Sequence, residues 1–177
     1  MKQTILIYGL LSGLIVTAMM IVTTTMCYQN ENFQSSMTLG FGTMFVAFCT
    51  IFIAVRNIRD KYNNGVISFG KAFIIGFYVA LIASTIYVVV WLIYYYIFIP
   101  DFMDKYTAHV LKEAKMDGGT KEEINSKIEE MNNYKELYKN PLFVILLTYM
   151  EILPVGLVMS LVSAFMMKRK VQRKDLV

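Results

Sequence analysis

Charged residues are scarce in this sequence, and most of the chain lacks them altogether. Asp, Glu, Lys and Arg make up only 17% of its 177 residues, against about a quarter in soluble domains. Four long apolar runs, at about residues 4–26, 37–55, 72–99 and 141–167, contain no charged residue except Glu151. A helix needs about 20 apolar residues to cross a bilayer core about 30 Å thick. The runs exclude an ordinary soluble domain and predict an all-α polytopic membrane protein with four transmembrane helices.

Residues that catalyse reactions or bind metals are also scarce. The sequence has a single histidine, His109, and two cysteines. It shows no His/Cys/Asp/Glu cluster with metal-ligand spacing, no glycine-rich phosphate loop and no nucleophile motif. Intramembrane proteolysis would need a catalytic dyad within the runs, and none is visible. We therefore expect no catalytic residue, no metal site and no cofactor, and we do not expect an enzyme.

Lysine and arginine are distributed unevenly among the shorter segments outside the runs, while the long segment at residues 100–140 is mildly acidic, with seven Lys against nine Asp and Glu. The segment after the first run, residues 27–36, contains none, whereas residues 56–71 contain four and the tail at 168–177 is strongly basic. Basic loops remain on the cytoplasmic side of a membrane, so we expect both termini and residues 56–71 to be cytoplasmic. The net charge of +4 is then a sign of topology and does not indicate binding to nucleic acid. The first run is longer than a signal-peptide core and is expected to stay as a span, which leaves one membrane domain, residues 1–177.

The segment between the third and fourth runs, residues 100–140, has a helical pattern of its own. Thr120 and Glu123 have the spacing of a capping box, which starts a helix, and two glycines at 118–119 precede it. Apolar residues recur at helical spacing on both sides of the glycines: Met103, Tyr106 and Val110, then Ile124, Ile128, Met131 and Tyr138. We expect an extracytoplasmic helical hairpin, which either caps the bundle as a spacer or docks a partner protein.

Small residues indicate how the spans pack. Helices in lipid associate by close packing of small side chains. Three runs carry them at a spacing of four: Gly9 and Gly13, then Ala72, Gly76, Ala80 and Ser84, and finally Gly156, Ser160 and Ala164. The expected topology puts all three stripes in the cytoplasmic half and the bulky aromatic residues in the outer half. We therefore predict a bundle that is tight on the cytoplasmic side and wider outside. The stripes suit packing within one chain or an oligomer interface, and the oligomeric state stays open.

Glu151 is the one carboxyl inside a predicted span. It lies ten residues after Pro141, or about 15 Å into the helix at 1.5 Å per residue. A charge at that depth costs at least about 2.5–3.5 kcal/mol, so the group must find a partner, face water or keep its proton. Pro154 lacks an N–H group, which frees the carbonyl oxygen of Met150 and favours a kink. Counting depth along the other runs makes Tyr87, Trp91 and Thr17 the candidate partners.

Three interpretations of Glu151 follow. It could couple a small transporter to protons or cations, since ionisable groups inside membranes mark functional sites. It could be a neutral, hydrogen-bonded pin between the third and fourth spans, because no other run contains a charged residue that would extend a proton relay. It could also contact another subunit.

Several short motifs resemble one bacterial family. They are Phe69-Gly70-Lys71-Ala72-Phe73, Trp91-Leu92-Ile93-Tyr94-Tyr95-Tyr96, Pro100-Asp101-Phe102, Tyr134-Lys135, Asn140-Pro141-Leu142-Phe143, and the group Glu151, Pro154 and Gly156. In order and kind they resemble domain of unknown function family 4199, found mainly in Gram-negative bacteria of the Bacteroidota type. The resemblance covers nearly the whole chain and implies a multi-pass protein of the bacterial inner membrane with four spans. It implies no activity and no catalytic residues.

These observations lead to two functional hypotheses of different classes. The first is a non-enzymatic accessory or assembly subunit of the inner membrane, which binds a membrane or periplasmic protein through its outer hairpin. The alternative is a small oligomeric transporter coupled to protons or cations through Glu151. A water-accessible cavity at Glu151 would separate them, because transport needs one and a neutral pin does not.

Overall fold

The computed structural model describes residues 1–30 and 33–169, and these residues are helical almost throughout. They form α1 (Lys2–Asn30), α2 (Gln34–Phe48), α3 (Thr50–Tyr62), α4 (Phe69–Ile93), a π-helical turn η1 (Tyr94–Phe98), α5 (Phe102–Met116), α6 (Lys121–Leu137) and α7 (Pro141–Met167). The described ranges contain no β-strand, only one isolated bridge between Ile67 and Arg169. The all-α fold class is therefore confirmed.

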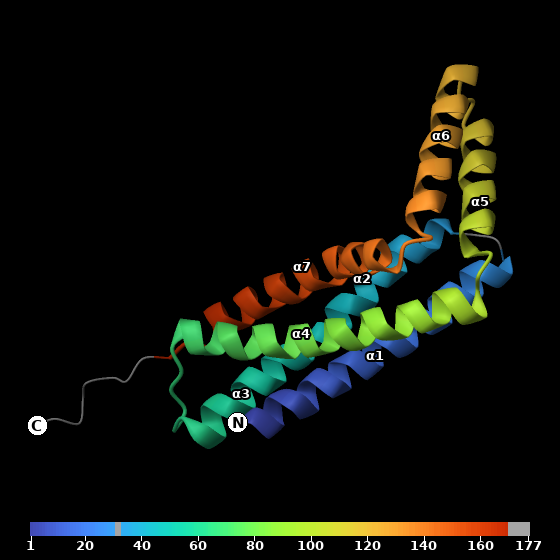
Figure 1. Ribbon diagram of the computed structural model, residues 1–177. Coiled ribbons are helices and arrows are strands. Elements are labelled where there is room, and N and C mark those ends of the chain that lie inside the picture. Colours follow the sequence, from blue (N-terminus) through green and yellow to red (C-terminus); the bar gives the residue numbers. More distant parts are fainter. Residues whose placement is uncertain (31–32, 170–177) are drawn as a thin grey trace, which may run out of the picture.

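Four helical segments are long and apolar enough to cross a membrane. They are Lys2–Gln29, Leu39–Tyr62, Phe69–Phe98 and Pro141–Met167. The second consists of α2 and α3, which meet at a break at Cys49, and the third consists of α4 continued by η1. This arrangement fits an integral membrane protein with four spans (Figure 1).

The helices extend past the apolar runs from which the spans were predicted. The second run ends at residue 55, but α3 continues to Tyr62 and carries Arg56 and Arg59. Charged side chains do not end a helix whose last turn reaches water. Asn64 and Gly65, both with positive φ, form the turn that ends it instead. The predicted loop at residues 56–71 therefore shrinks to the few residues between α3 and α4.

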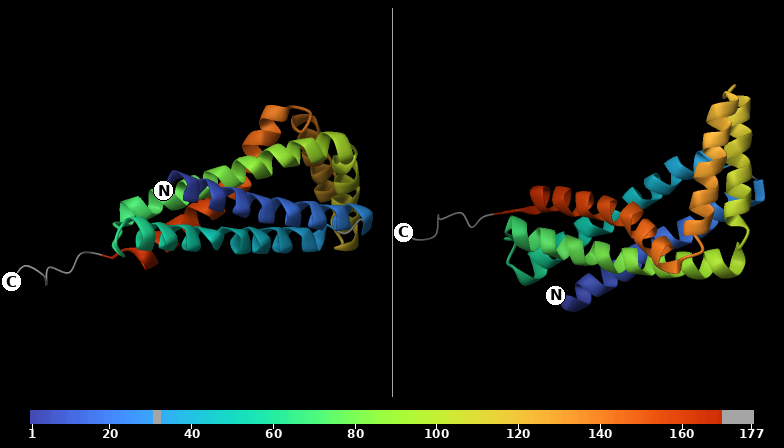
Figure 2. Two further views of the ribbon diagram at one scale, coloured as in Figure 1. Left: turned by 90° about the horizontal axis from the view of Figure 1, so that it is seen from below. Right: turned by 45° about the horizontal axis from the view of Figure 1, so that its top comes forward.

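The four spans form an elongated bundle in which α4 is the central helix. It packs along α7 on one side and α1 on the other, while α2 and α3 complete the bundle. Figure 2 shows the four segments running roughly lengthwise, with the start of α1 and the end of α7 at the same end. The buried core runs along this length, and Phe48 and Ile51 are among its fully buried side chains.

Small residues bring the spans into close contact, as their spacing predicts. A Cβ atom on Gly76 of α4 would lie 2.9 Å from the Cβ of Ser160 in α7. On α1, a Cβ on Gly9 would lie 2.8 Å from Ile82, and one on Gly13 would lie 2.6 Å from Ile86. Ala72, Ala80, Ser84, Ser160 and Ala164 are all fully buried. Residues of all three stripes thus take part in packing within the chain.

A pair of helices, α5 and α6, stands at a steep angle to the bundle at the end opposite the termini (Figure 1). The capping box expected at Thr120 is present: the Thr120 N–H donates to Glu123 at 2.8 Å, and the Glu123 N–H donates to Thr120 Oγ1 at 3.3 Å. Lys135 of α6 forms an ion pair with Asp104 of α5. The Tyr28 hydroxyl donates to Asp101, which ties the end of α1 to the start of α5.

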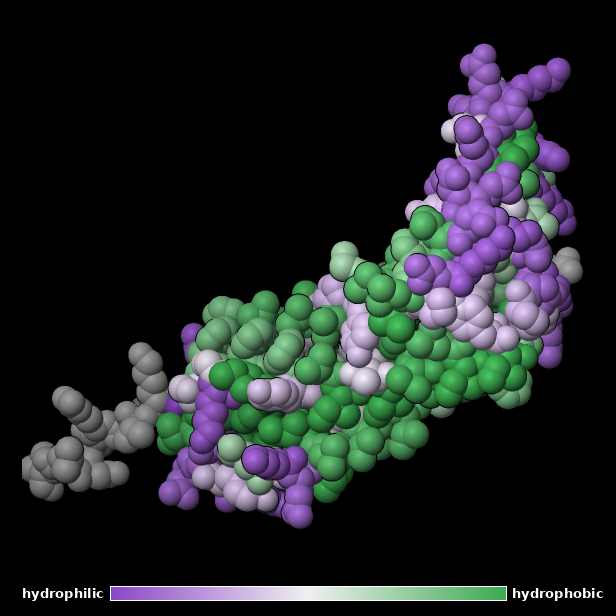
Figure 3. All heavy atoms as spheres, in the orientation of Figure 1, coloured by the Kyte–Doolittle hydropathy of each residue, from purple (hydrophilic) through white to green (hydrophobic). Residues whose placement is uncertain are grey.

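Surface hydropathy follows the same division. Figure 3 shows a hydrophobic surface over the long helices and a hydrophilic one over α5 and α6, with a second hydrophilic patch at the opposite end. An apolar band between two polar ends suits a bilayer. Of the predicted basic tail, Lys168 and Arg169 are described, and the Arg169 N–H donates to the Ile67 carbonyl oxygen at 3.0 Å. Residues 170–177 lie outside the described residues.

Candidate functional site

A cavity of about 560 Å³ lies where the bundle meets the α5/α6 pair. Its walls come from six α-helices, α1, α2 and α4 to α7, and from the junction after α6. The lining residues are Met20, Thr23, Thr24, Phe33, Gly40, Phe41, Tyr87, Trp91, Phe102, Met103, Tyr106, Val110, Lys127, Glu130, Met131, Tyr134, Tyr138, Leu147, Thr148 and Glu151. The cavity thus occupies the end with bulky side chains, where the sequence predicts a wider bundle.

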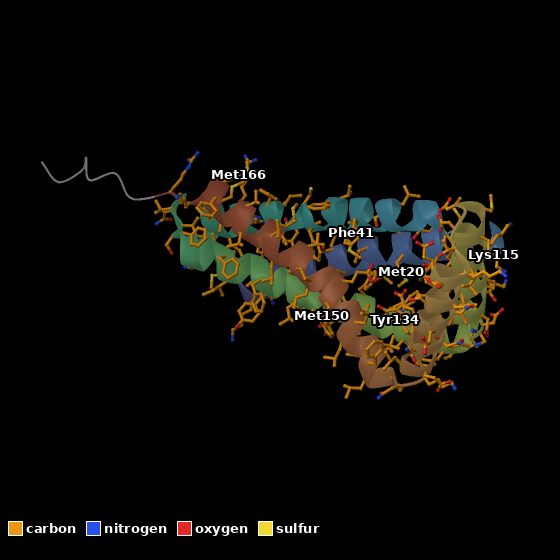
Figure 4. All side chains as sticks on the ribbon, turned by 90° about the horizontal axis from the view of Figure 1, so that it is seen from above. Met20, Phe41, Lys115, Tyr134, Met150 and Met166 are labelled. Carbon is orange, nitrogen blue, oxygen red and sulfur yellow. The ribbon has the colours of Figure 1, made fainter. Side chains whose placement is uncertain are left out.

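Helix tilt opens this space. Seen from above, the ribbons of α2 and α7 diverge toward the α5/α6 pair, and the labelled Phe41 and Tyr134 lie in this region (Figure 4). At the opposite end the small-residue contacts hold α4 and α7 together. The helix bundle is therefore closely packed at one end and open at the other.

Glu151 is the acidic residue at the base of this cavity. Protein atoms surround its carboxyl on several sides, yet the side chain is exposed because the cavity opens beside it. Within the described residues Glu151 accepts no hydrogen bond and forms no ion pair; the nearby salt bridges all join other residues. A carboxyl within a span therefore meets space for water or a ligand and lacks a protein partner.

Two of the three predicted partners of Glu151 share its cavity. Tyr87 and Trp91 of α4 both line the cavity, as counting depth along the spans predicts, although neither forms a hydrogen bond with Glu151 in the described structure. The third, Thr17, is buried in α1, does not line the cavity, and its hydroxyl has no hydrogen-bond partner within the described ranges. Counting depth along the chain does not give the direction of a side chain, and Thr17 is buried in the bundle away from the cavity lining.

Tyr138, at the end of α6, lies close enough to Glu151 to be affected by its charge. Burial raises the pKa of the Tyr138 phenol above its usual value, and the negative charge of Glu151 raises it further. The Tyr138 ring packs against Tyr95 at 5.5 Å and against Phe143 at 6.1 Å between centroids. The Tyr96 hydroxyl donates to the Tyr138 carbonyl oxygen at 2.9 Å. These contacts fix the residue over the cavity.

The α5 side of the cavity is an aromatic cluster. The Trp91 ring meets Phe102 edge to face at 5.7 Å, and Phe102 stacks on Tyr106 at 6.2 Å. Phe33 contacts Phe102 and Tyr106 at 5.6 Å each, also edge to face. Rings that support one another in this way form a rigid aromatic wall.

Pro154 lies inside α7, one turn after Glu151. The helix continues through it from Pro141 to Met167, and its ribbon bends along its length (right-hand view of Figure 2). Proline provides no N–H group for the Met150 carbonyl oxygen. The bend separates the part of α7 that lines the cavity from the part that packs on α4 through Gly156.

Sequence reasoning missed most of the wall. Met20, Gly40 and Phe41 come from α1 and α2, and Lys127, Glu130 and Tyr134 come from α6. The apolar spacing of Met103, Tyr106 and Val110 did mark one face of α5, and that face lines the cavity. No local pattern shows that α6 leans over the end of the bundle, because this depends on the angle at which the pair leaves it.

The fold and the cavity define the class of protein: a helical membrane protein with four spans. A comparison with protein families identifies the group within that class. Residues 7–169 match the profile of the family described as protein of unknown function (DUF4199), so the chain belongs to this family, as the motifs indicated. Searches of curated proteins and of solved structures find no match.

Proposed function

We propose that the protein is a small transporter whose ligand site is the cavity and whose coupling group is the Glu151 carboxyl. One observation carries this proposal. The only carboxyl found within the described spanning segments away from their ends has no protein partner and faces a cavity. A neutral pin would need a hydrogen-bond partner in place of that space, since a buried polar group without one is costly.

The cavity is suited to bind a small molecule. Its volume of about 560 Å³ lies within the range of about 300–1,000 Å³ that is usual for ligand sites. Its wall is mostly apolar and aromatic, with few polar groups, which is also typical of such sites. The α7 bend at Pro154 provides a point at which the outer half of that helix can move relative to the packed inner half.

Carbodiimide labelling tests whether Glu151 titrates and is accessible. Dicyclohexylcarbodiimide takes the proton of a carboxylic acid on nitrogen while the carboxyl oxygen bonds to its central carbon, and acyl transfer to nitrogen leaves a stable N-acylurea. We expect mass spectrometry of the purified protein to find this adduct on Glu151, with a yield that falls as the pH is raised. Deprotonation removes the reactive form and explains the fall.

Matched variants make the labelling test specific. Glu151→Gln should lose the adduct, whereas Glu130→Gln, at the rim of the same cavity, should keep it. The thermal stability of the wild type should also change with pH in a way that Glu151→Gln does not follow. The proposal would be contradicted if Glu151 did not react at any pH and the stability curves of wild type and Glu151→Gln coincided. The interpretation of Glu151 as a neutral pin would then be favoured.

The orientation in the bacterial inner membrane is part of the proposal. The basic residues of α3 and of the chain end support cytoplasmic termini, and the α5/α6 pair would then lie outside the cytoplasm. Single cysteines at Glu122 and at Lys61, in a chain with Cys27 and Cys49 replaced by serine, test it in intact cells. A membrane-impermeant maleimide should label position 122 and not position 61, and the reverse pattern would invert the topology.

A second candidate, the accessory subunit, has support at the tip of the helix pair. Met116 at the end of α5 is 77% exposed, and a shallow hollow beside it is lined by Ala108, Leu111, Lys112 and Lys115. An exposed methionine next to a hollow is a feature of protein contacts. A photocrosslinking residue at position 116 should give one discrete adduct in cells, and one at position 129 should not. The absence of an adduct at 116 would count against this candidate.

A further inference from the structure

The charges that line the cavity leave one negative charge unbalanced. Three of its lining residues can carry a full charge at neutral pH: Lys127, Glu130 and Glu151. Lys127 forms an ion pair with Glu130 at 2.8 Å, so these two neutralise each other. Glu151 has no such partner in the described residues. A ligand that completes the charge balance therefore carries a single positive charge.

The rest of the wall favours an organic cation over a metal ion. The described residues contain no group of three His, Cys, Asp or Glu placed to hold a metal, and two of the threonines in the wall bond to their own helix backbones. Thr148 donates to the Val144 carbonyl oxygen at 2.7 Å, and Thr23 donates to that of Met19 at 2.9 Å. The wall thus consists largely of aromatic side chains, whereas a metal ion would need several oxygen ligands.

Aromatic faces attract cations that carry apolar groups. A cation over the face of Trp or Tyr gains about 2 kcal/mol or more when the site excludes water. Trp91, Tyr87 and Tyr138 all line the cavity together with Glu151, and Met20, Met103 and Met131 contribute polarizable surface. A ligand with a diffuse charge and an apolar body would satisfy both parts of the wall.

We infer that the cavity binds a lipophilic organic cation of single charge, which exchanges with the proton of Glu151. This inference rests on the proposed function, since it uses Glu151 as the group that binds either ligand. The exchange balances charge: binding of one cation at the carboxylate releases one proton to water, and loss of the cation restores the carboxylic acid. The site then carries the same net charge in both states.

The other titratable groups that face Glu151 come from three helices and from the junction after α6. They are Tyr87 of α4, Tyr106 of α5, Lys127, Glu130 and Tyr134 of α6, and Tyr138. The lining residues of α1 and α2 in the described structure include no titratable side chain. Phenols ordinarily keep their protons near pH 7, and the ion pair raises the pKa of Lys127 and keeps it charged. A proton released on cation binding at neutral pH therefore comes from Glu151.

Tetraphenylphosphonium is the probe for the test, because it has one diffuse charge and four aromatic rings. We expect it to bind the purified full chain in calorimetry. Its affinity should rise by about tenfold per pH unit while Glu151 is protonated and level off above that range, since one proton is released per cation bound. It should also protect Glu151 from the carbodiimide. Glu151→Gln should weaken binding by at least about a hundredfold, and Trp91→Ala by about tenfold.

Matched controls separate charge from hydrophobicity. Glu129→Gln, which removes a carboxylate from the exposed surface of α6 outside the cavity, should leave the affinity unchanged. Triphenylphosphine oxide, which has similar rings and no net charge, should bind much more weakly than the cation. Tetramethylammonium, which has the charge without the rings, should also bind weakly. Equal binding of the neutral compound would overturn the inference, because the site would then select rings alone.

The outcomes distinguish this inference from the proposed function. If Glu151 reacts with the carbodiimide in a pH-dependent way but tetraphenylphosphonium does not protect it, the choice of ligand is wrong and the coupling role of Glu151 stands. Glu151 that never reacts would overturn both. If Glu151→Gln binds tetraphenylphosphonium with the same affinity and pH dependence as wild type, the cation binds elsewhere. That result would overturn the inference even if Glu151 titrates.

Discussion

Gly156 of α7 lies directly against Ala80 of α4. A Cβ atom added to Gly156 would sit 2.7 Å from the Ala80 Cβ and 3.1 Å from a ring carbon of Phe48. Neither neighbour is the end of a long flexible side chain, so the helices themselves would have to move. This contact holds the two spans together at the closed end of the bundle.

The first prediction concerns this contact. Gly156→Ala should destabilise the protein, because overpacking of a tight core costs about 1–3 kcal/mol. Over most of its range that cost exceeds the stability of about 1 kcal/mol that alanine gains over glycine through helix propensity. Thermal unfolding in detergent should show a lower midpoint. Gly42→Ala in α2 is the control, since a Cβ there meets nothing within 4 Å, and a similar drop for both variants would contradict the prediction.

The second prediction concerns the start of α6. Thr120→Ala removes the side-chain half of the capping box and should cost about 1 kcal/mol of local helix stability. Hydrogen exchange should accelerate in the first turn of α6 and stay unchanged in α7. The carboxylate of Glu123 also loses a partner: the Thr120 N–H and hydroxyl hold the pKa of that carboxyl below its usual value, so the pKa should rise when the hydroxyl is removed. Ser126→Ala, on an exposed face of the same helix, should change neither quantity.

The third prediction concerns pH and the link between α1 and α5. The hydroxyl of Tyr28 donates to Asp101 and holds the pKa of that carboxyl below its usual value. A lowered pKa in the folded state adds stability above the unfolded pKa of about 3.9, and this stability is lost as the pH falls through the folded pKa. Tyr28→Phe should therefore be less stable than wild type at neutral pH and approach it in acid.

The measurement for this link is the difference in unfolding temperature between wild type and Tyr28→Phe across the acid range. Tyr62→Phe is the matched control, because Tyr62 is 53% exposed and at the far end of the bundle. Its difference from wild type should stay near zero at every pH. A Tyr28→Phe difference that stays constant into acid would show that the ring and not the hydroxyl is responsible.

The fourth prediction concerns a hydrogen bond between spans. The hydroxyls of Thr85 and Tyr149 lie 2.9 Å apart and join α4 to α7 near the cavity. Tyr149→Phe keeps the ring and removes this bond, and bonds of this type inside membranes contribute about 0.6 kcal/mol on average. A small decrease in stability is therefore expected in chemical denaturation. Tyr78→Phe, at an exposed position of α4, should have no effect, and a loss above about 2 kcal/mol for Tyr149→Phe would exceed this class of bond.

The four membrane-length helices and the helix pair could be predicted from sequence because each depends on local rules. A run without charge defines a span, and the capping box at Thr120 with the glycines before it defines the start of α6. Spacing of small residues such as Gly76 and Gly156 also indicated which faces meet. These features require no knowledge of how distant segments are oriented.

The cavity could be predicted only in part, because it depends on rotation and tilt. Counting along the spans gives depth, and Tyr87 and Trp91, the predicted partners of Glu151, line the same cavity without a hydrogen bond to it. It does not give the direction of a side chain, which is why Thr17 was expected there and lies elsewhere. Lys127 and Glu130 line the cavity because of the angle between the α5/α6 pair and the bundle, and no pattern within α6 predicts that angle.

The position of Trp91 has a practical consequence. It is the only tryptophan in the sequence, and it stands in the cavity wall with its ring against Phe102. Selective excitation of indole therefore reports on this wall alone, without interference from the twelve tyrosines. The wavelength of tryptophan emission from the unlabelled protein therefore shows whether water, lipid or a ligand fills the space beside Glu151.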